Sequence, residues 1–133
     1  MPRIVFRKVI YKNMSPKITI IKRDSYSFPI HFENVNCGDL DITGYTLFFT
    51  VKTLANLDGA DTLAIIQKSI TSHTDPTHGE SLITLTNTDT DQVAGTYYYD
   101  IQIKSPTGTI TSCEKGEFVI SQDVTKRTDV PST

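Results

Sequence analysis

The sequence predicts an all-β protein of one domain, and three observations support this. The chain has 133 residues, a typical length for a single domain. Thr, Ile and Val make up about a third of it, and these β-branched side chains suit a pleated sheet. Ala occurs only at positions 55, 60, 64 and 94, and no long stretch shows a 3.6-residue apolar period. Apolar runs are only a few residues long, which argues against a membrane span.

In the N-terminal half we expect strands that are interrupted by polar, Gly- or Pro-containing segments. Within residues 26–32 the side chains alternate strictly, with Tyr26, Phe28, Ile30 and Phe32 on one face. Pro29 cannot donate to a ladder, so this strand is expected at an edge or with a bulge at that point. The strands expected in this half cover residues 4–12, 17–23, 26–32 and 45–52.

The C-terminal half continues this pattern and contains a predicted hairpin. Residues 105–108 read Ser-Pro-Thr-Gly, which suits a type I turn with the glycine in the left-handed region. Gly116 is the expected position of a bulge in the second strand of this hairpin. Residues 88–95 are polar and suggest a crossover with one 3₁₀ turn. The strands expected here cover residues 63–70, 81–86, 96–104 and 109–121.

Seven to eight short strands at regular spacing predict an immunoglobulin-like Greek-key β-sandwich with an N-terminal arm. The expected divisions are a basic arm or extra strand over 1–16, the sandwich over 17–122 and a polar tail over 123–133. Tyr97, which enters a strand after a polar crossover, is either a tyrosine corner or an ordinary buried strand residue. Neither Cys37 nor Cys113 occupies the position of an inter-sheet disulfide, so we expect free thiols, as in a reducing cytoplasm.

The formal net charge of −2 conceals a strong asymmetry along the chain. The first 23 residues contain seven basic residues and no acidic one, so the remainder carries a net charge of about −9. A basic arm on an acidic body favours contacts with complementary protein surfaces. Basic arms also track phosphates, but the acidic body would repel nucleic acid, so nucleic-acid binding is the weaker interpretation.

Residues that could carry out chemistry are few. His73, Asp75 and His78 lie within one six-residue loop, and His-x4-His with an intervening Asp has the ligand types of a zinc site. An ordinary Asp-Pro turn explains the same residues, and we expect neither a metal nor another cofactor. Phosphate-loop, nucleophile and paired acid/base motifs are missing from the sequence, so we expect a protein that is not an enzyme. Three aspartate pairs have the residue type of weak calcium sites, although turn aspartates usually cap backbone amides: Asp39/Asp41, Asp58/Asp61 and Asp89/Asp91.

Two surfaces are candidates for protein contacts. The alternation places Phe48 and Tyr98 on the solvent side of two strands that are expected to be neighbours, where they would form an aromatic patch. His31 is also expected to face outward, toward solvent or an interface. The second surface is the arm, which is either an edge strand protected by its charges or a strand donated to a neighbouring subunit. Its candidate contact residues are Arg3, Phe6, Arg7, Lys8 and Lys12.

Four segments in a fixed order resemble the N-terminal domain of phage baseplate upper proteins. They are Ile18–Asp24 (ITIIKRD), Asp41–Lys52 (DITGYTLFFTVK), His73–Pro76 (HTDP) and Gly95–Gln102 (GTYYYDIQ), and the match covers about residues 17–125. The resemblance implies an immunoglobulin-like domain of a tailed-phage virion that docks on the tail baseplate or a similar symmetric platform. It offers no catalytic residues to carry over.

This chain departs from the family pattern at both ends. Such domains usually begin near the ITIIKRD segment and continue into a linker and a trimerising, receptor-facing region, whereas about sixteen residues precede the match here and the sequence stops at Thr133. We therefore expect a virion structural or adaptor protein, assembled in the host cytoplasm, with other phage structural proteins as partners and many copies or a homo-oligomer. A capsid decoration or neck accessory protein is an alternative. A carbohydrate-binding adsorption module is an alternative of another class, although the loops contain almost no aromatic residues.

Overall fold

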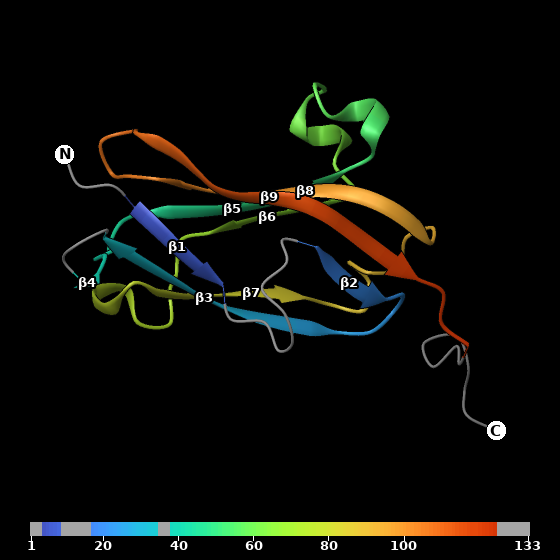
Figure 1. The fold of residues 1–133 in the computed structure, drawn as a ribbon, viewed down its shortest axis with the longest axis horizontal. Helices are drawn as coiled ribbons and strands as arrows, with labels where there is room; N and C mark the ends of the chain where they lie inside the picture. The colour runs from blue at the N-terminus through green and yellow to red at the C-terminus, as the bar shows by residue number, and fades with distance from the viewer. Residues whose placement is uncertain (1–3, 9–16, 35–37, 125–133) are drawn as a thin grey trace.

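A computed structural model describes residues 4–8, 17–34 and 38–124, which form two packed β-sheets (Figure 1). The four-stranded sheet contains β1 (Ile4–Lys8), β3 (Tyr26–Asn34), β4 (Gly38–Asp39) and β7 (Glu80–Leu85). The five-stranded sheet contains β2 (Ile18–Ile21), β5 (Thr46–Lys52), β6 (Ile66–Ile70), β8 (Gly95–Lys104) and β9 (Ile110–Ser121). This architecture confirms the predicted immunoglobulin-like sandwich.

The order of the strands shows how the chain alternates between the sheets. In the four-stranded sheet, β3 pairs with β1 along one edge and with β7 and then β4 along the other. The order in the five-stranded sheet is β2-β9-β8-β5-β6, with β2 parallel to β9 and the remaining pairs antiparallel. Residues 4–8 thus pair with the chain's own β3. They form the edge strand that was the simpler of the two interpretations of the arm.

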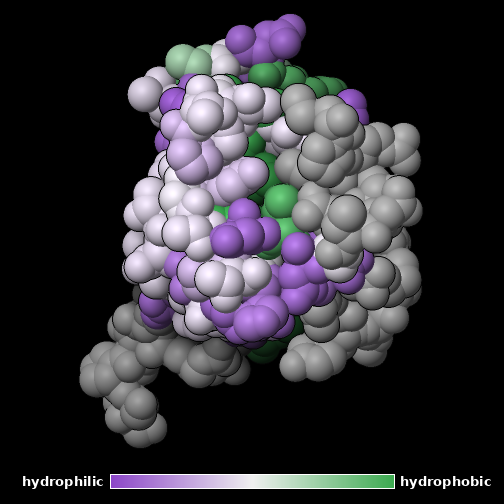
Figure 2. All heavy atoms as spheres, turned by 90° about the vertical axis from the view of Figure 1, so that its left-hand side faces the viewer, coloured by the Kyte–Doolittle hydropathy of each residue, from purple (hydrophilic) through white to green (hydrophobic). Residues whose placement is uncertain are grey.

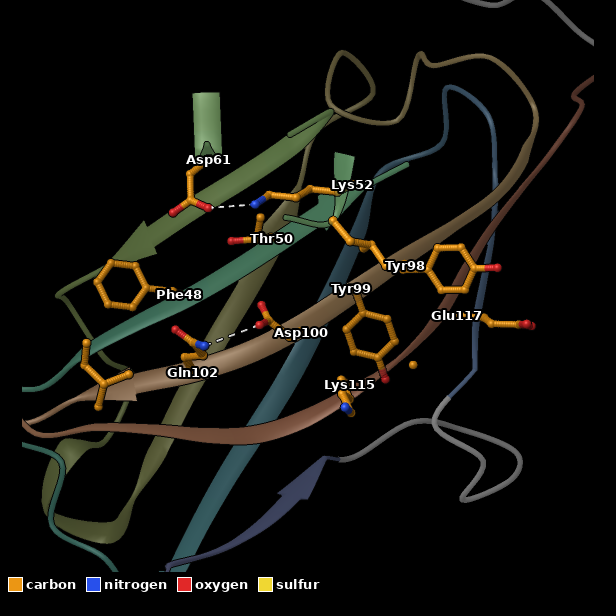
Figure 3. A pocket seen from close by; sticks show the side chains of 13 residues that line it. Phe48, Thr50, Lys52, Asp61, Tyr98, Tyr99, Asp100, Gln102, Lys115 and Glu117 are labelled. Carbon is orange, nitrogen blue, oxygen red and sulfur yellow. Dashed lines mark hydrogen bonds and ion pairs between the residues drawn. The ribbon is translucent and has the colours of Figure 1, made fainter. Parts of the chain in front are cut away.

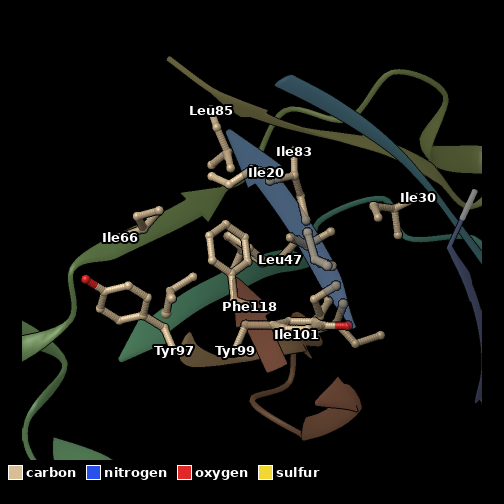
Figure 4. Close-up of a cluster of buried hydrophobic side chains, with 14 of the residues drawn as sticks. Ile20, Ile30, Leu47, Ile66, Ile83, Leu85, Tyr97, Tyr99, Ile101 and Phe118 are labelled. Carbon is tan, nitrogen blue, oxygen red and sulfur yellow. The ribbon is translucent and has the colours of Figure 1, made fainter. Parts of the chain in front are cut away.

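The core fills the space between the two sheets and follows the predicted alternation (Figure 4). Ile30 and Phe32 enter it from β3, and they face Leu47 and Phe49 from β5. At its centre three rings from the five-stranded sheet pack at tilted or edge-to-face angles, with centroids 5.9–6.4 Å apart. These rings belong to Phe49, Tyr99 and Phe118.

Tyr97 is a tyrosine corner, because its hydroxyl donates to the carbonyl oxygen of Val93, four residues upstream. The bond closes the turn that leads into β8 and satisfies a hydroxyl that is otherwise buried. The hairpin turn also forms as predicted. The N–H of Gly108 donates to the carbonyl of Ser105, and Gly108 adopts a φ of 98°.

The predicted bulge lies at a different residue. Gly116 pairs directly with Tyr99, and the register shifts instead between Ile101 and Gln102, so that Cys113 is the extra residue in β9. Gly116 is compatible with a regular ladder, so glycine alone did not specify the bulge. The half-buried Cys113 has a free thiol, whose pKa is raised to about 12 by burial. Cys37 lies outside the described residues.

The short helices also differ from expectation. Residues 87–90 form a turn without a 3₁₀ helix, and the 3₁₀ helices of the described chain lie elsewhere. They are η1 (Leu54–Asn56), η2 (Asp61–Leu63) and η3 (Pro76–His78). Across the described ranges, no helix is long and apolar enough to span a membrane.

Candidate functional site

The outer face of the five-stranded sheet presents a regular array of side chains from β5, β8 and β9. Even-numbered positions of β5 and β8 point outward, because their odd-numbered neighbours are buried in the core. Phe48 is opposite Gln102, and Lys52 is opposite Tyr98. The two predicted aromatic residues therefore lie on the same face but four residues apart along the strands, about 13 Å. Thr50 and Asp100 form the pair between them.

This array forms the floor of an open groove with a volume of about 760 Å³ (Figure 3). The segment between β5 and β6, which contains η1 and η2, rises over the sheet and supplies one wall (Figure 1). The groove combines aromatic, aliphatic and charged side chains. Its lining residues are Phe48, Thr50, Lys52, Leu57, Asp61, Tyr98, Tyr99, Asp100, Gln102, Ile110, Lys115, Gly116 and Glu117.

Lys52 attaches this wall to the sheet. Its ammonium group lies 3.0 Å from the carboxylate of Asp61 and donates to the carbonyl oxygen of Gly59 at 2.9 Å. The Lys52 side chain is only 12% exposed, whereas that of Asp61 is 65% exposed. Lys52 is therefore the more buried partner of the pair. Its contacts with Asp61 and Gly59 hold the segment that forms the wall against the sheet.

Asp100 lies at the middle of the floor and is partly removed from solvent. Burial raises the pKa of its carboxyl above the ordinary aspartate value, the charge of Lys52 lowers it and the charge of Asp61 raises it. Gln102 donates to the same carboxylate from the neighbouring outward position of β8. A half-buried carboxylate between two aromatic side chains is a strong acceptor for hydrogen bonds from a ligand.

Tyr99 contributes to the groove from below the floor. Its ring packs in the core, while its hydroxyl donates to a carboxylate oxygen of Glu114 beside the bulge of β9. Burial raises the pKa of Tyr99, so the hydroxyl stays protonated and remains a donor at neutral pH. Tyr99 thus connects the core to the part of β9 that borders the groove.

The loop with the zinc-type pattern does not gather its three residues. Both nitrogens of the His73 imidazole are engaged in the fold, one with the Ser81 hydroxyl and the other with the Tyr45 carbonyl, each at 2.8 Å. Asp75 and His78 do come together, at 3.0 Å, on the exposed surface. Hydrogen bonding to Asp75 and its charge raise the pKa of His78. His73 thus has a structural role that its position in the sequence did not reveal.

The aspartate pairs are divided between caps and ion pairs. Asp41 accepts from the backbone and hydroxyl of Thr43, and Asp89 accepts from the backbone N–H of Thr86. Asp61 and Asp91 are paired with Lys52 and with Arg23, respectively. These contacts agree with the usual role of turn aspartates.

The structure describes only the backbone of residues 4–8 of the arm. Arg3 and Lys12 lie outside the described residues, and for Phe6, Arg7 and Lys8 only the strand pairing of the backbone is described. Phe48 and Tyr98 are consequently the predicted interface residues whose surroundings are known. Both are half-buried and both line the groove.

Sequence reasoning found these two aromatic residues but missed the polar residues between them. The signal for Asp100 and Gln102 was present, because the alternation that exposes Tyr98 also exposes them. The positions of Leu57 and Asp61 had no comparable signal, since they depend on how the segment after β5 folds over the sheet.

No family model and no curated protein matches this chain. Solved structures with a similar fold include CopC from Methylosinus trichosporium OB3b, at 13% identity and a TM-score of 0.48, covering 84% of this chain and 89% of that one. Another is the extracellular domain of the putative hybrid two component system BT3049 from B. thetaiotaomicron, at 13% identity and a TM-score of 0.42, covering 92% of this chain and 15% of that one. A third is AggA, the major subunit of aggregative adherence fimbriae type I from Escherichia coli, at 8% identity and a TM-score of 0.34, covering 92% and 96%. At this level of similarity these structures say nothing about the ligands or partners of this chain.

Proposed function

We propose that this chain is a non-enzymatic structural or adaptor protein of a phage virion, and that it docks on another virion protein through the groove. The observation that carries the proposal is that Phe48 and Tyr98 line the same groove on the outer face of the five-stranded sheet. The virion context comes from the sequence resemblance to baseplate upper proteins. A tail platform is favoured on this basis, and a neck or capsid position is the alternative.

The chemistry of the groove favours a protein partner. Aromatic residues at the centre of an interface frequently carry most of the binding energy, and Phe48 and Tyr98 provide two such anchors. The rim carries both signs of charge, with Lys115 and Glu117 on neighbouring outward positions of β9. A mixed rim complements the mixed surface of a protein better than the uniform negative charge of a nucleic acid.

The sheet supports this role mechanically. Tyr98 and Phe48 protrude from β8 and β5, two adjacent strands that pair along seven residue positions. The backbone of paired strands is already ordered before a partner binds, which lowers the entropic cost of association. A virion adaptor present in many copies would use this rigid face to repeat one contact around a symmetric platform.

Site-specific crosslinking tests the proposal. Tyr98 is replaced by the photoreactive residue p-benzoylphenylalanine, virions are purified from the host that carries the gene, and crosslinked proteins are identified by mass spectrometry. We expect the chain to be present in the particles and to crosslink to one structural protein. The same replacement at Val93, which is 76% exposed and lies outside the groove, is the matched control and should give no such product.

Affinity for the protein identified in this way is then measured by titration calorimetry. Phe48→Ala and Tyr98→Ala are each expected to weaken binding by a factor of 10 or more, the effect of removing an interface anchor worth at least about 1.4 kcal/mol. Val93→Ala should bind as the wild type does. Absence of the chain from purified particles, or equal binding by all three variants, would refute the proposal.

A glycan ligand is the second candidate, and one observation favours it. The carboxylate of Asp100 and the amide of Gln102 lie between the two aromatic positions, and planar polar groups beside aromatic rings suit sugar hydroxyls and sugar ring faces. A glycan array probed with the wild type and with Tyr98→Ala distinguishes the candidates. A signal that Tyr98→Ala removes, without a crosslink to a virion protein, would favour the adsorption module.

A further inference from the structure

A second cluster of polar side chains lies on the four-stranded sheet, away from the groove. His31 and Glu33 project from β3 as alternate residues, and Asp39 of β4 pairs directly with Glu33. One ligand atom from each of the three lies within 4.8 Å of the other two. The closest contact is 2.8 Å between His31 Nε2 and Asp39 Oδ1, and His31 Nδ1 lies 3.7 Å from Glu33 Oε2.

The backbone holds this cluster in place through three separate segments. The N–H of Leu40 donates to the carbonyl of Phe32 at 3.0 Å, and the N–H of Phe32 donates to the carbonyl of Gly79 at 2.9 Å. Gly79 has a φ of 73°, and a Cβ there would lie 2.3 Å from the Phe32 carbonyl oxygen. Only glycine permits this approach, so the turn after η3 lies directly against β3 and Leu40.

We propose that His31, Glu33 and Asp39 bind a divalent first-row transition-metal ion, and that Zn²⁺ fits them best. Imidazole nitrogen and carboxylate oxygen are both ligand types of zinc, and a site with three protein ligands leaves the fourth position to water. The imidazole favours a transition-metal ion over Mg²⁺ or Ca²⁺. Bond lengths of about 2.1 Å place neighbouring ligands of a tetrahedral ion about 3.4 Å apart. The two carboxylates contact different nitrogens of the His31 ring, so one carboxylate has to rotate toward the nitrogen that binds the ion. One ligand atom from each residue already lies within 4.8 Å of the other two, so the movement needed is a side-chain rotation.

Residues of both charge signs surround the cluster, and Arg7 of β1 pairs directly with His31. Asp75, His78 and Glu80 lie at the same end of the sandwich. The hydrogen bond to Asp75 and its charge raise the pKa of His78, and the charges of Asp39 and Glu80 add smaller contributions in the same direction. Glu80 pairs directly with His31 across β3 and β7. Figure 2 views the side on which β4 lies in Figure 1, and hydrophilic residues gather there around a narrow strip of hydrophobic atoms. An ion bound by these residues would link β4 to β3 through their side chains.

Titration calorimetry of the full chain with ZnCl₂ tests the proposal. We expect one ion per chain and an increase in the melting temperature with Zn²⁺ concentration, because the ion binds the folded state. His31→Gln and Asp39→Asn are each expected to lower the affinity by a factor of 10 or more. The melting temperature of each metal-free variant, measured in parallel, separates loss of ligands from loss of folding.

The chain offers matched controls for both residue types. His78→Gln removes an exposed imidazole from the same end of the molecule, and Asp58→Asn removes an exposed carboxylate far from the cluster in sequence. Both should bind Zn²⁺ within threefold of the wild type. If His78→Gln loses as much affinity as His31→Gln, the assignment of the site to these three residues is wrong. If Zn²⁺ does not bind, or if Ca²⁺ binds as tightly as Zn²⁺, the proposal of a transition-metal site is wrong.

Discussion

The two faces of β5 and β8 differ more than their sequences suggest. Phe48 and Phe49 are adjacent, as are Tyr98 and Tyr99, yet in each pair one ring is packed in the core and the other lines the groove. The inner rings of Phe49 and Tyr99 pack against each other on the inner face of the five-stranded sheet, whereas the outer rings lie about 13 Å apart and have charged and polar residues between them. Residue type alone therefore does not show which aromatic side chain lines the groove. Whether the residue occupies an odd or an even position of the strand does show it.

This difference separates residues that stabilise the fold from residues that we propose to bind a partner. The inner positions are close-packed and determine the free energy of unfolding. The outer positions contribute little to the core, so their identities are available for recognition. Substitutions in adjacent pairs test this separation directly, because backbone, strand and residue type are shared within each pair.

The largest expected effect is at the adjacent phenylalanines. Phe49→Ala removes a fully buried ring at the centre of the aromatic cluster and should lower the free energy of unfolding by about 3–5 kcal/mol. Phe48→Ala removes a half-buried ring on the groove and should cost less than about 1.5 kcal/mol. Urea denaturation followed by circular dichroism measures both, and equal losses would show that the two faces are not energetically distinct.

The inner and outer faces could be assigned from the sequence because strand periodicity is local. Alternation placed Phe49 and Tyr99 inside and Phe48 and Tyr98 outside, and it required no knowledge of which strands are neighbours. The turn at residues 105–108 was also predictable, since proline and glycine fix its φ angles. The position of the bulge could not be predicted. It depends on the register in which β9 pairs with β8, and the sequence around Cys113 carries no local signal for it.

The sites depended on longer-range geometry and were only partly predictable. The groove needs the segment after β5 to fold over the sheet, held by Lys52, and such a contact leaves no periodic pattern. The cluster of His31, Glu33 and Asp39 needs the register between β3 and β4. For the same reason His73 was a misleading candidate, since its partners Ser81 and Tyr45 come from other elements of the fold.

An intermediate effect is expected at the adjacent tyrosines 97 and 98. Tyr97→Phe removes the hydroxyl that donates to the Val93 carbonyl, and loss of a buried hydrogen bond should cost about 1 kcal/mol. Tyr98→Phe retains the ring on the groove and should leave the stability within about 0.5 kcal/mol of the wild type. Thermal unfolding of both variants checks this, and a larger loss in Tyr98→Phe would contradict the assignment of the corner to Tyr97.

The smallest effect, and the one with a distinctive pH dependence, is expected from Asp100. Because burial raises its folded-state pKa, the ionised carboxylate disfavours folding at neutral pH, and its favourable contribution is present only below the unfolded-state pKa. Asp100→Asn should therefore raise the melting temperature at pH 7, and the gain should vanish as the pH falls below about 3.9. The amide can still accept the hydrogen bond from Gln102, so the comparison isolates the charge.

Asp41 provides the control of opposite sign. Hydrogen bonds from the Thr43 hydroxyl and then from its backbone lower the pKa of Asp41, so its carboxylate stabilises the fold above the unfolded-state pKa, and this stabilisation is lost as the pH falls through the folded value. Asp41→Asn should accordingly lower the melting temperature at pH 7, with the deficit closing in acid. Two aspartates on one chain would then respond oppositely to the same substitution. The difference arises because Asp100 lies on a groove floor shielded from water, whereas Asp41 caps an exposed turn. If both substitutions instead lowered the melting temperature at pH 7, the carboxylate of Asp100 would stabilise the fold. Attraction to a nearby positive charge, and not desolvation, would then dominate its pKa.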